Sequence, residues 1–293
     1  MSARPRRVAI VGHIGRPEVR REAARVRARL ARRGCDVRLE RELAETLGVP
    51  GQPLDALARW CQLMISLGGD GTVLIAGRAL AGRRGVLLAV NLGGLGFLAA
   101  AEAHELDGAV DAVFAGRWPI VTRTGVEAQV RRRRGARPGP WQFALNDAVV
   151  RSGVSYAAIH LRVDSMGRDL GHLVADGLIA ASASGSTAYS LSAGGPLVAP
   201  DLHALVVTPA CAHALGSRSL VLPPGASVGA RVLSPGPALL VLDGQDPLEL
   251  SRGDEVEMRL ASRLVRVHQN PERPFLRALQ AKLGWQGSQR RSL

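Results

Sequence analysis

The first 115 residues alternate between short apolar runs and helical stretches, and this alternation constrains the fold more than any other feature. The expected strands are Val8 to Val11, Leu63 to Leu67 and Val86 to Val90, and the expected helices are Pro17 to Arg33, Thr72 to Leu80 and His104 to Phe114. Strands that alternate with helices are typical of a parallel α/β sheet. Glycine-rich loops follow the second and third strands, at the edge where such sheets bind ligands.

After Trp118 the pattern changes to closely spaced β-type runs separated by Gly, Pro, Ser and Asp. These runs are Gly125 to Arg133, Ala144 to Arg151, Ala157 to Asp164, Asp169 to Val174, Leu205 to Thr208, Ala238 to Leu242 and Glu255 to Leu260. Regular spacing of this kind predicts a β-sandwich. We expect an α/β domain at 1–118, a β-rich domain at 119–270, and a closing helix and tail at 271–293 that dock on the first domain. Arg131 to Arg134 and the residues after them predict a surface hairpin loop.

The chain carries 38 Lys and Arg against 25 Asp and Glu, which gives a formal charge of +13. Such a charge is typical of proteins that bind nucleic acid or acidic membranes. However, Lys282 is the only lysine, and aromatic residues make up 3%, which leaves few rings to stack bases. An arginine-rich, Ala- and Gly-rich chain is typical of a GC-rich genome. We therefore expect solvated arginine faces and no specific nucleic-acid partner.

The single lysine also excludes several catalytic designs. A Walker A loop, a protein kinase and a pyridoxal enzyme each need a lysine at a defined place, whereas Lys282 lies in the helical tail. Cys35, Cys61 and Cys211 are scattered, and the histidines lack metal-ligand spacing. No apolar run is long enough for a membrane span or a secretory signal. These features predict a cytoplasmic protein without structural zinc or disulfides.

Gly68-Gly69-Asp70-Gly71-Thr72 follows an expected strand and precedes an expected helix. Adjacent glycines let backbone N–H groups approach phosphate oxygens, and a helix N-terminus favours negative charge. The Asp70 carboxylate is suited to polarising a hydroxyl or holding Mg²⁺. The alternative is an ordinary Asp-Gly turn in which Asp70 caps the helix.

Two further segments favour a nucleotide ligand. The loop Asn91 to Phe97 follows the next strand, although its glycine spacing does not match the dinucleotide fingerprint and a tight turn is the alternative. The stretch Ser184 to Pro196 is rich in hydroxyl groups and glycines, and Tyr189 within it offers a flat face for a base. The alternative is an inert flexible connector, against which Tyr189 argues. Asn146 and Asp147 interrupt a β-type run, as functional residues often do.

Taken in order, these segments resemble the NAD kinase family. Its GGDG loop matches Gly68 to Gly71, and its N-x-G-x-LGFL loop matches Asn91 to Leu98. Its remaining motifs are an Asn-Glu pair, a Ser/Thr-rich segment and a late Asp-Gly-Gln stretch, which match Asn146-Asp147, Asp176 to Pro196, and Asp243-Gly244-Gln245. GGDG alone is also found in lipid kinases, so the Ser/Thr-rich segment is the specific signal. The likeness runs from about Val8 to Trp285.

The resemblance implies transfer of a phosphoryl group from ATP or inorganic polyphosphate to the 2′-hydroxyl of the adenosine ribose of NAD, giving NADP. It implies Asp70 as general base and as a ligand of Mg²⁺ or another divalent cation, and it implies a homodimer or homotetramer. The substrate-binding residues implied are Asp70, Gly71, Asn146, Asp147, Asp176, Thr187, Ala188, Tyr189, Ser190, Ser192 and Gln245. The residues implied for the phosphate donor are Gly68, Gly69 and Thr72, with Arg78 as a substitute for a cation that the family often has at the position of Ile75.

Other departures concern substrate affinity rather than the reaction. Asp147 stands where the family has Glu, and Ala157 and Val174 stand where basic residues are frequent, with His172 as a nearby candidate for the second. A diacylglycerol or sphingoid-base kinase that shares the GGDG loop is the alternative enzyme. A nucleotide sensor or basic DNA-associated protein is the alternative without catalysis.

Overall fold

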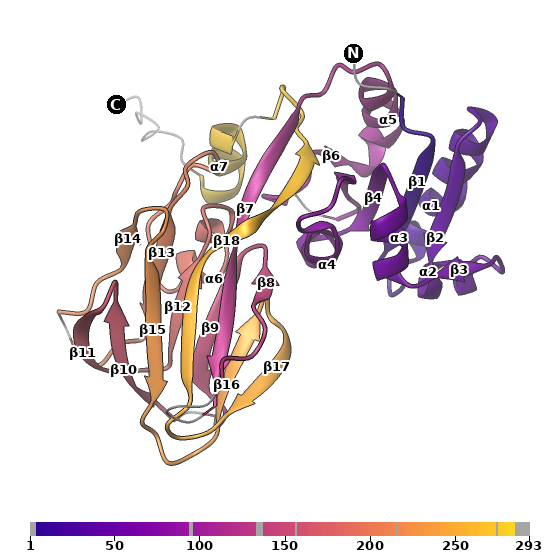
Figure 1. Cartoon of the computed structure of the whole chain (residues 1–293). Helices are drawn as coiled ribbons and strands as arrows, with labels where there is room; N and C mark the ends of the chain where they lie inside the picture. The colour runs from indigo at the N-terminus through magenta and orange to yellow at the C-terminus, as the bar shows by residue number, and fades with distance from the viewer. Residues whose placement is uncertain are drawn as a thin grey trace, which may run out of the picture. The chain divides into compact units, whose positions relative to one another are not determined.

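A computed structural model describes residues 4–93, 96–132, 137–155, 157–214, 216–273 and 275–284. The residues outside these ranges include 133–136 of the expected hairpin loop, Gly94 and Leu95 of the second glycine-rich loop, and the tail from Trp285. The chain forms two compact units, one made of Met1–Thr122 with Val265–Leu293 and the other of Arg123–Leu264 (Figure 1). Within the part of the chain that is described, no helix has the length and apolar character needed to cross a membrane.

The first unit is a parallel sheet with helices on both faces. Its strands are β1 (Arg7–Gly12), β2 (Asp36–Glu40), β3 (Gly51–Gln52), β4 (Leu63–Gly68), β5 (Val86–Asn91) and β6 (Ala101–Glu102), in the order β3-β2-β1-β4-β5-β6. Its helices are α1 (Pro17–Arg32), α2 (Arg41–Thr46), α3 (Leu54–Trp60), α4 (Asp70–Leu80), the short 3-10 helix η1 (Ala103–Glu105), α5 (Leu106–Phe114) and α7 (Phe275–Leu283). The end of β18 (Glu255–His268) pairs with β5.

Alternation along the buried strands distributes side chains to the two faces of this sheet. Val8 and Ile10 of β1 pack in one core cluster with α1 and α5, while α3 and α4 contact each other and β1. Helix α1 forms because Val19, Ala23, Val26 and Leu30 recur at helical spacing and are all buried. Gly34, with φ +76°, ends this segment as expected.

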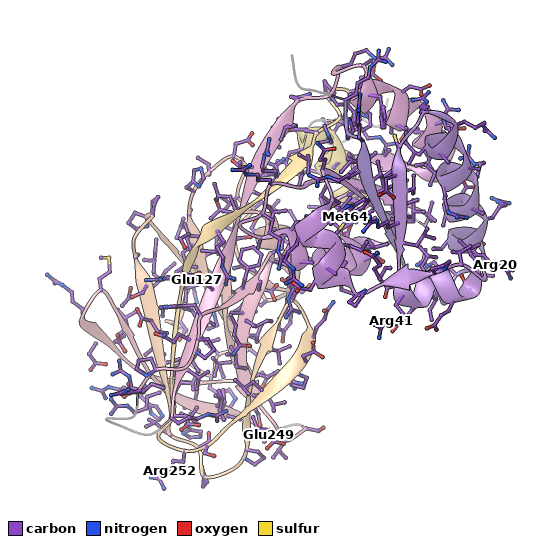
Figure 2. All side chains as sticks on the ribbon, turned by 45° about the vertical axis from the view of Figure 1, so that its right-hand side comes forward. Arg20, Arg41, Met64, Glu127, Glu249 and Arg252 are labelled. Carbon is purple, nitrogen blue, oxygen red and sulfur yellow. The ribbon has the colours of Figure 1, made fainter. Side chains whose placement is uncertain are left out.

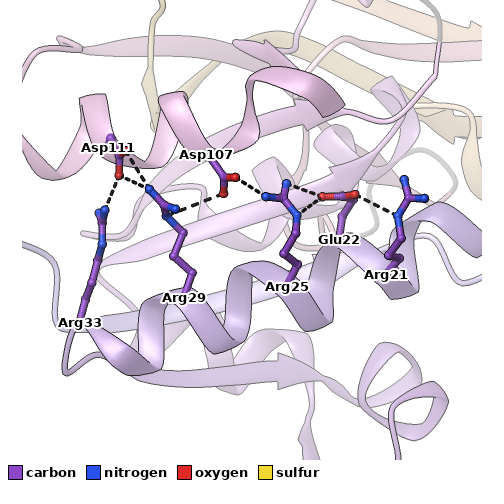
Figure 3. Close-up of polar contacts among 7 residues, drawn as sticks. All are labelled: Arg21, Glu22, Arg25, Arg29, Arg33, Asp107 and Asp111. Atoms are coloured by element: carbon purple, nitrogen blue, oxygen red, sulfur yellow. Dashed lines mark hydrogen bonds and ion pairs between the residues drawn. The ribbon is translucent and has the colours of Figure 1, made fainter.

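The arginines of α1 form ion pairs with α5 (Figure 3). Arg25 and Arg33 pair with Asp107 and Asp111 respectively, and Arg29 Nη2 lies 2.8 Å from Asp111 Oδ1. Arg25 also lies 2.6 Å from Glu22, which is buried on α1. These contacts explain part of the arginine content without any nucleic-acid partner.

The second unit is a sandwich of two sheets. One has the order β11-β10-β15-β18-β7-β8 and the other β14-β13-β12-β9-β16-β17. The strands are β7 (Ile120–Arg131), β8 (Gln142–Ala144), β9 (Asp147–Ser152), β10 (Ile159–Ser165), β11 (Arg168–Ala175), β12 (Gly177–Ala181), β13 (Leu205–Ala210), β14 (Leu220–Leu222), β15 (Ser227–Val232), β16 (Ala238–Leu242), β17 (Gln245–Leu250) and β18. β7 and β18 carry the chain between the two units.

The sandwich core is built from inward residues of both sheets, such as Leu161 and Val228 from one and Val150 and Leu178 from the other. The outer face of the second sheet is also covered, because the segment 183–198 packs on Val149, Ile179 and Val206. This segment contains the 3-10 helix η2 (Ser184–Thr187) and α6 (Tyr189–Ser192). Strands β9 and β12 read as continuous apolar runs because both of their faces are buried.

In both units most charged side chains point outward and apolar side chains fill the interior (Figure 2). Arg20, Arg41, Glu249 and Arg252 point outward, whereas Met64 is fully buried in β4. Glu127 is buried too, because Arg259 pairs with it at 2.8 Å.

Three expectations differ from the structure. The elements β2, α2, β3 and α3 between Asp36 and Trp60 were not predicted, because their apolar runs are too short to show a period. The run from Ala144 to Arg151 is two strands, since the chain leaves one sheet after β8 and enters the other at β9. The sequence pattern places Phe275, Leu276, Leu279 and Leu283 on one apolar face of α7, but only Leu279 of these is fully buried, and Leu276 is 62% exposed.

Candidate active site

The two glycine-rich loops of the first unit lie side by side at the carboxyl edge of its sheet. Strands β4 and β5 are parallel, and Gly68 is opposite Asn91 where they end. The Leu92 N–H donates to the Gly68 carbonyl at 3.0 Å, which joins the two loops directly. This is the arrangement expected of a ligand-binding edge in an open α/β sheet.

Asp70 is the first residue of α4, and its carboxylate faces the second loop rather than its own helix. The N-cap is Gly69, and no side chain caps the helix, so the turn-and-cap alternative for Asp70 is wrong. The Phe97 N–H donates to Asp70 Oδ2 at 3.3 Å. Asp70 Oδ1 is buried and has no hydrogen-bond partner among the described residues. Gly96 makes this contact possible, since a Cβ there would overlap Oδ1.

The rest of the GGDGT loop presents open backbone. A Cβ at Gly69 or Gly71 would meet nothing within 4 Å. Gly68 is glycine for a different reason, because a Cβ there would overlap the Thr72 hydroxyl. The first N–H groups of a helix have no partner within the helix, so the start of α4 offers donors to an anion.

Arg78 is not brought to this loop. It lies in the last turn of α4, eight residues after Asp70, which corresponds to about 12 Å along a helix. Two other cations lie at the second loop, and the sequence analysis did not select them. Arg16 lies against Gly93, where a Cβ would overlap its guanidinium. Lys282 on α7 lies with Nζ 4.4 Å from the centre of the Phe97 ring.

In the second unit, Asn146 and Asp147 lie where the chain changes sheets. The Asp243 carboxylate accepts the N–H groups of Leu145, Asn146 and Asp147 at 2.8, 2.7 and 3.3 Å. On the other side, the Ser182 hydroxyl donates to the Leu145 carbonyl at 2.7 Å. Sequence reasoning placed Asp243 in a motif but gave it no role, because its partners are distant in sequence.

The Asn146 and Asp147 side chains are only 7% and 5% exposed. Asn146 Oδ1 is buried without a hydrogen-bond partner. Burial, together with the nearby negative charge of Asp243, raises the pKa of the Asp147 carboxyl from its ordinary value of 3.8 to about 7. The pair thus offers an unpaired amide oxygen and a carboxyl group that changes charge near neutral pH.

The Ser/Thr-rich segment divides into exposed and buried positions. Tyr189 is 44% exposed, Ser192 is exposed, and Thr187 and Ala188 are half-buried. The Thr187 hydroxyl donates to the Ser184 carbonyl at 3.0 Å. Ser190 is fully buried, and its hydroxyl pairs with that of Thr208 at 2.9 Å, a placement that does not support direct contact with a substrate.

Asp176 lies away from Asn146 and Asp147. It precedes β12, whereas Asp147 pairs with Ala181 at the far end of that strand, roughly 16 Å away along the strand. Asp176 is exposed and hydrogen-bonds the Cys211 thiol, which raises the pKa of that thiol. Gln245 is the half-buried first residue of β17 and follows the turn that carries Asp243.

Apart from the buried Asp147, the positions that depart from the family pattern lie at or near the surface. Ile75 on α4 is 42% exposed, and Ala157 and Val174 are half-buried. His172 is exposed, and its ring centre lies 5.3 Å from that of His160. Among the described residues, no three or more metal-ligating side chains gather in one cluster.

The first unit has a glycine-rich loop with an unpaired carboxylate oxygen, and the second has a buried amide and carboxyl pair. Both features suit a nucleotide-dependent phosphotransferase that works without a P-loop lysine. Residues 8–118 match the family model of the ATP-NAD kinase N-terminal domain, and residues 145–269 match that of the C-terminal domain. The chain belongs to the NAD kinase family.

Two NAD kinases are similar in sequence to this chain over almost its whole length. It is 37% identical over 283 residues to the NAD kinase of Syntrophotalea carbinolica, covering 96% of this chain and 99% of that protein. It is 36% identical over 302 residues to NAD kinase 2 of Streptomyces coelicolor, covering 97% and 98%. The predicted family and enzyme class are confirmed, and the lipid-kinase alternative gains no support.

Solved structures share the fold. Yeast NADH kinase, solved in complex with NADH, has a TM-score of 0.90 and 25% identity over 98% of this chain and 90% of that one. An NAD kinase from Archaeoglobus fulgidus, solved in complex with ATP, has a TM-score of 0.74 and 22% identity, covering 95% and 97%. The predicted fold class, a parallel α/β part with a β-sandwich, is confirmed.

Proposed function

We propose that this protein is an NAD kinase that uses ATP or inorganic polyphosphate to phosphorylate the 2′-hydroxyl of the adenosine ribose of NAD. Asp70 removes the proton of that hydroxyl while the oxygen forms its bond to the terminal phosphorus. The bond from this phosphorus to the leaving ADP, or to the shortened polyphosphate, breaks in the same step. The observation that carries the proposal is the buried Asp70 Oδ1 atom, which has no hydrogen-bond partner in the part of the chain that the structure describes.

Each unit supplies a different set of groups. The start of α4 and the open backbone at Gly69 and Gly71 suit a phosphate chain. In the second unit, Asn146 and Asp147 suit the ribose hydroxyls and adenine, with Tyr189 as a face for the base. Phosphoryl transfer depends mainly on positioning and charge neutralisation, so no covalent intermediate with the protein is needed.

A divalent cation fits this arrangement. Mg²⁺ is commonly bound by one or two carboxylates together with substrate phosphates, and Asp70 Oδ1 is an available carboxylate oxygen. When bound, Mg²⁺ would neutralise charge on the phosphoryl oxygens. Asp70 and the phosphate chain of the donor are the groups that would hold it.

The decisive experiment is NADP formation by the purified protein. Wild type with NAD and Mg²⁺-ATP, or Mg²⁺-polyphosphate, is assayed by coupling to an NADP-specific dehydrogenase, with boiled protein as the blank. We expect NADP from at least one donor, and no NADP from either would refute the proposal. Diacylglycerol is the comparison acceptor and is expected to be inactive.

The base is tested with Asp70→Asn, and Asp107→Asn is the matched control. Asp107 also has a buried oxygen without a hydrogen bond, but it lies in the ion-pair network between α1 and α5. We expect D70N to lose about 10² to 10⁴ in turnover with NAD binding retained, and D107N to keep wild-type turnover. A D70N rate above about a tenth of wild type would rule out the base assignment.

Asp147→Ala tests the adenosine contact. It is expected to raise the KM for NAD while the KM for ATP stays unchanged, because its side chain is assigned to the acceptor. An unchanged KM for NAD would contradict that contact. A cytoplasmic location and a homodimer or homotetramer remain part of the proposal, and light scattering of the purified protein measures the assembly.

A further inference from the structure

The crossing between the two sheets of the sandwich creates a local hydrogen-bonding problem. Leu145 and Asn146 belong to neither β8 nor β9, so their N–H groups cannot pair in either sheet. Buried N–H groups without acceptors cost free energy, so this crossing requires acceptors from elsewhere in the chain. The acceptor comes from the turn between β16 and β17.

We propose that Asp243 and Ser182 are positioning residues that hold Asn146 and Asp147 in the orientation that binds the adenosine ribose of NAD. This inference rests on the proposed function and adds two residues that do not themselves touch the substrate. Together we call Asp243 and Ser182 the turn anchor.

Asp243 is fixed for this task by its backbone. It has φ +53° and is followed by Gly244 with φ +70°, which makes a two-residue turn between β16 and β17. Its carboxylate is 7% exposed and accepts three consecutive N–H groups. Its own N–H donates to the Asp147 carbonyl at 2.9 Å. The contact is therefore reciprocal and fixes both sides of the Asn146 peptide.

Ser182 holds the same crossing from the β12 side. It is fully buried, its hydroxyl donates to the Leu145 carbonyl at 2.7 Å, and its N–H donates to the Asn146 carbonyl at 2.8 Å. The same hydroxyl accepts the Gly185 N–H at 3.1 Å, which ties the crossing to the start of the Tyr189 segment. A Cβ at Gly185 would overlap the Asn146 carbonyl.

The result is a backbone held on both sides with one side-chain group left over. The N–H and carbonyl groups of Leu145, Asn146 and Asp147 all have partners, whereas the buried Asn146 Oδ1 has none within the described ranges. A buried polar atom without a partner, on a crossing whose backbone is held rigidly, is suited to a preorganised contact with a ligand. The anchor thus acts on substrate binding through the orientation of the Asn146 and Asp147 side chains.

Asp243→Asn tests the anchor, and Asp254→Asn is the matched control. An asparagine at 243 turns an NH₂ group toward a backbone N–H, so at least one contact becomes a donor facing a donor. Asp254 is another buried aspartate of the same unit, 2% exposed, which accepts the Ser251 N–H at 2.9 Å and is not part of the crossing. Asp254 also pairs with Arg132 at 2.9 Å, so D254N measures what the loss of a buried aspartate's turn contact and ion pair does outside the crossing.

The readouts are the Kd for NAD by calorimetry and the separate KM values for NAD and ATP. For D243N we expect about ten-fold weaker NAD binding, the size of one unpaired buried hydrogen bond, with an unchanged KM for ATP. Ser182→Ala is expected to weaken NAD binding about three-fold. D254N is expected to lower the melting temperature while the Kd for NAD stays within two-fold of wild type.

A folded D243N with an NAD Kd within two-fold of wild type would overturn the inference, as would equal losses in D243N and D254N. If D243N does not fold, S182A decides, and unchanged NAD binding in S182A then overturns it. NAD binding by calorimetry needs no turnover. Wild type that binds NAD but makes no NADP would refute the proposed function while leaving the anchor to be judged on its own.

Discussion

Asp147→Asn should remove a pH-dependent penalty on the stability of the second unit. Asp147 is 5% exposed, and burial together with Asp243 raises the pKa of its carboxyl from 3.8 to about 7. A raised pKa means that the folded state holds the proton more tightly than the unfolded state. The contribution of the Asp147 carboxyl to the free energy of unfolding is therefore greatest below about pH 4, falls as the pH rises toward 7, and stays constant above about pH 7.

The size of this effect follows from the two pKa values. The difference between 3.8 and about 7 corresponds to about 4 kcal/mol between the protonated and ionised limits. Between pH 4.5 and 7.5 the expected share is about 3 kcal/mol. Asparagine has nearly the same shape and is neutral throughout, so D147N should gain that amount relative to wild type across the range.

The assay is urea denaturation of wild type and D147N at several pH values from 4.5 to 8, followed by circular dichroism. The difference in unfolding free energy between the two proteins should widen by about 3 kcal/mol up to pH 7.5 and then level off. Asp246→Asn, which neutralises an exposed aspartate of β17, is the control and should show no such widening. A wild-type to D147N difference that is the same at every pH would refute the reasoning.

Four further variants test three contacts of the first unit. Gly96→Ala should push the Asp70 carboxylate out of position and lower kcat at least ten-fold in the coupled assay; wild-type kcat would contradict the contact. Lys282→Met should lower kcat about three-fold with an unchanged KM for NAD, and Lys282→Arg should restore it, because either cation can lie over Phe97; equal rates in both variants would argue against a role for the charge. Hydrogen bonds from Arg29 and Arg33 lower the pKa of the Asp111 carboxyl. The contribution of Asp111 to folding stability is therefore present at neutral pH and is lost as the pH falls through that lowered pKa. Since the group is 39% exposed, Asp111→Asn should cost at most about 1 kcal/mol, and less in high salt, as measured by urea denaturation; a larger cost that salt does not change would show that the network is not a surface effect.

The local sequence pattern predicted the two-part architecture and its longest elements. The buried runs that became β1, β4 and β5, the helix at Pro17–Arg32 and the spaced β-runs after Trp118 are visible because burial repeats with the period of a strand or helix. The loop positions also followed, since glycines at the ends of parallel strands collect at one edge of a sheet. The segment from Asp36 to Trp60 was missed because its elements are too short to show a period.

Among the candidate residues, the sequence by itself determined which chemical groups are available: the Asp70 loop, the Asn146 and Asp147 pair, and the absence of a P-loop lysine. Only the tertiary structure decided how they are held. It buried Ser190 in the core, put Asp176 and Asp147 at opposite ends of β12, and gave Asp243 its partners, with Asn146 97 positions away in sequence. A hydrogen bond between residues so far apart in sequence leaves no periodic signal in the chain, because it depends on where the chain crosses from one sheet to the other.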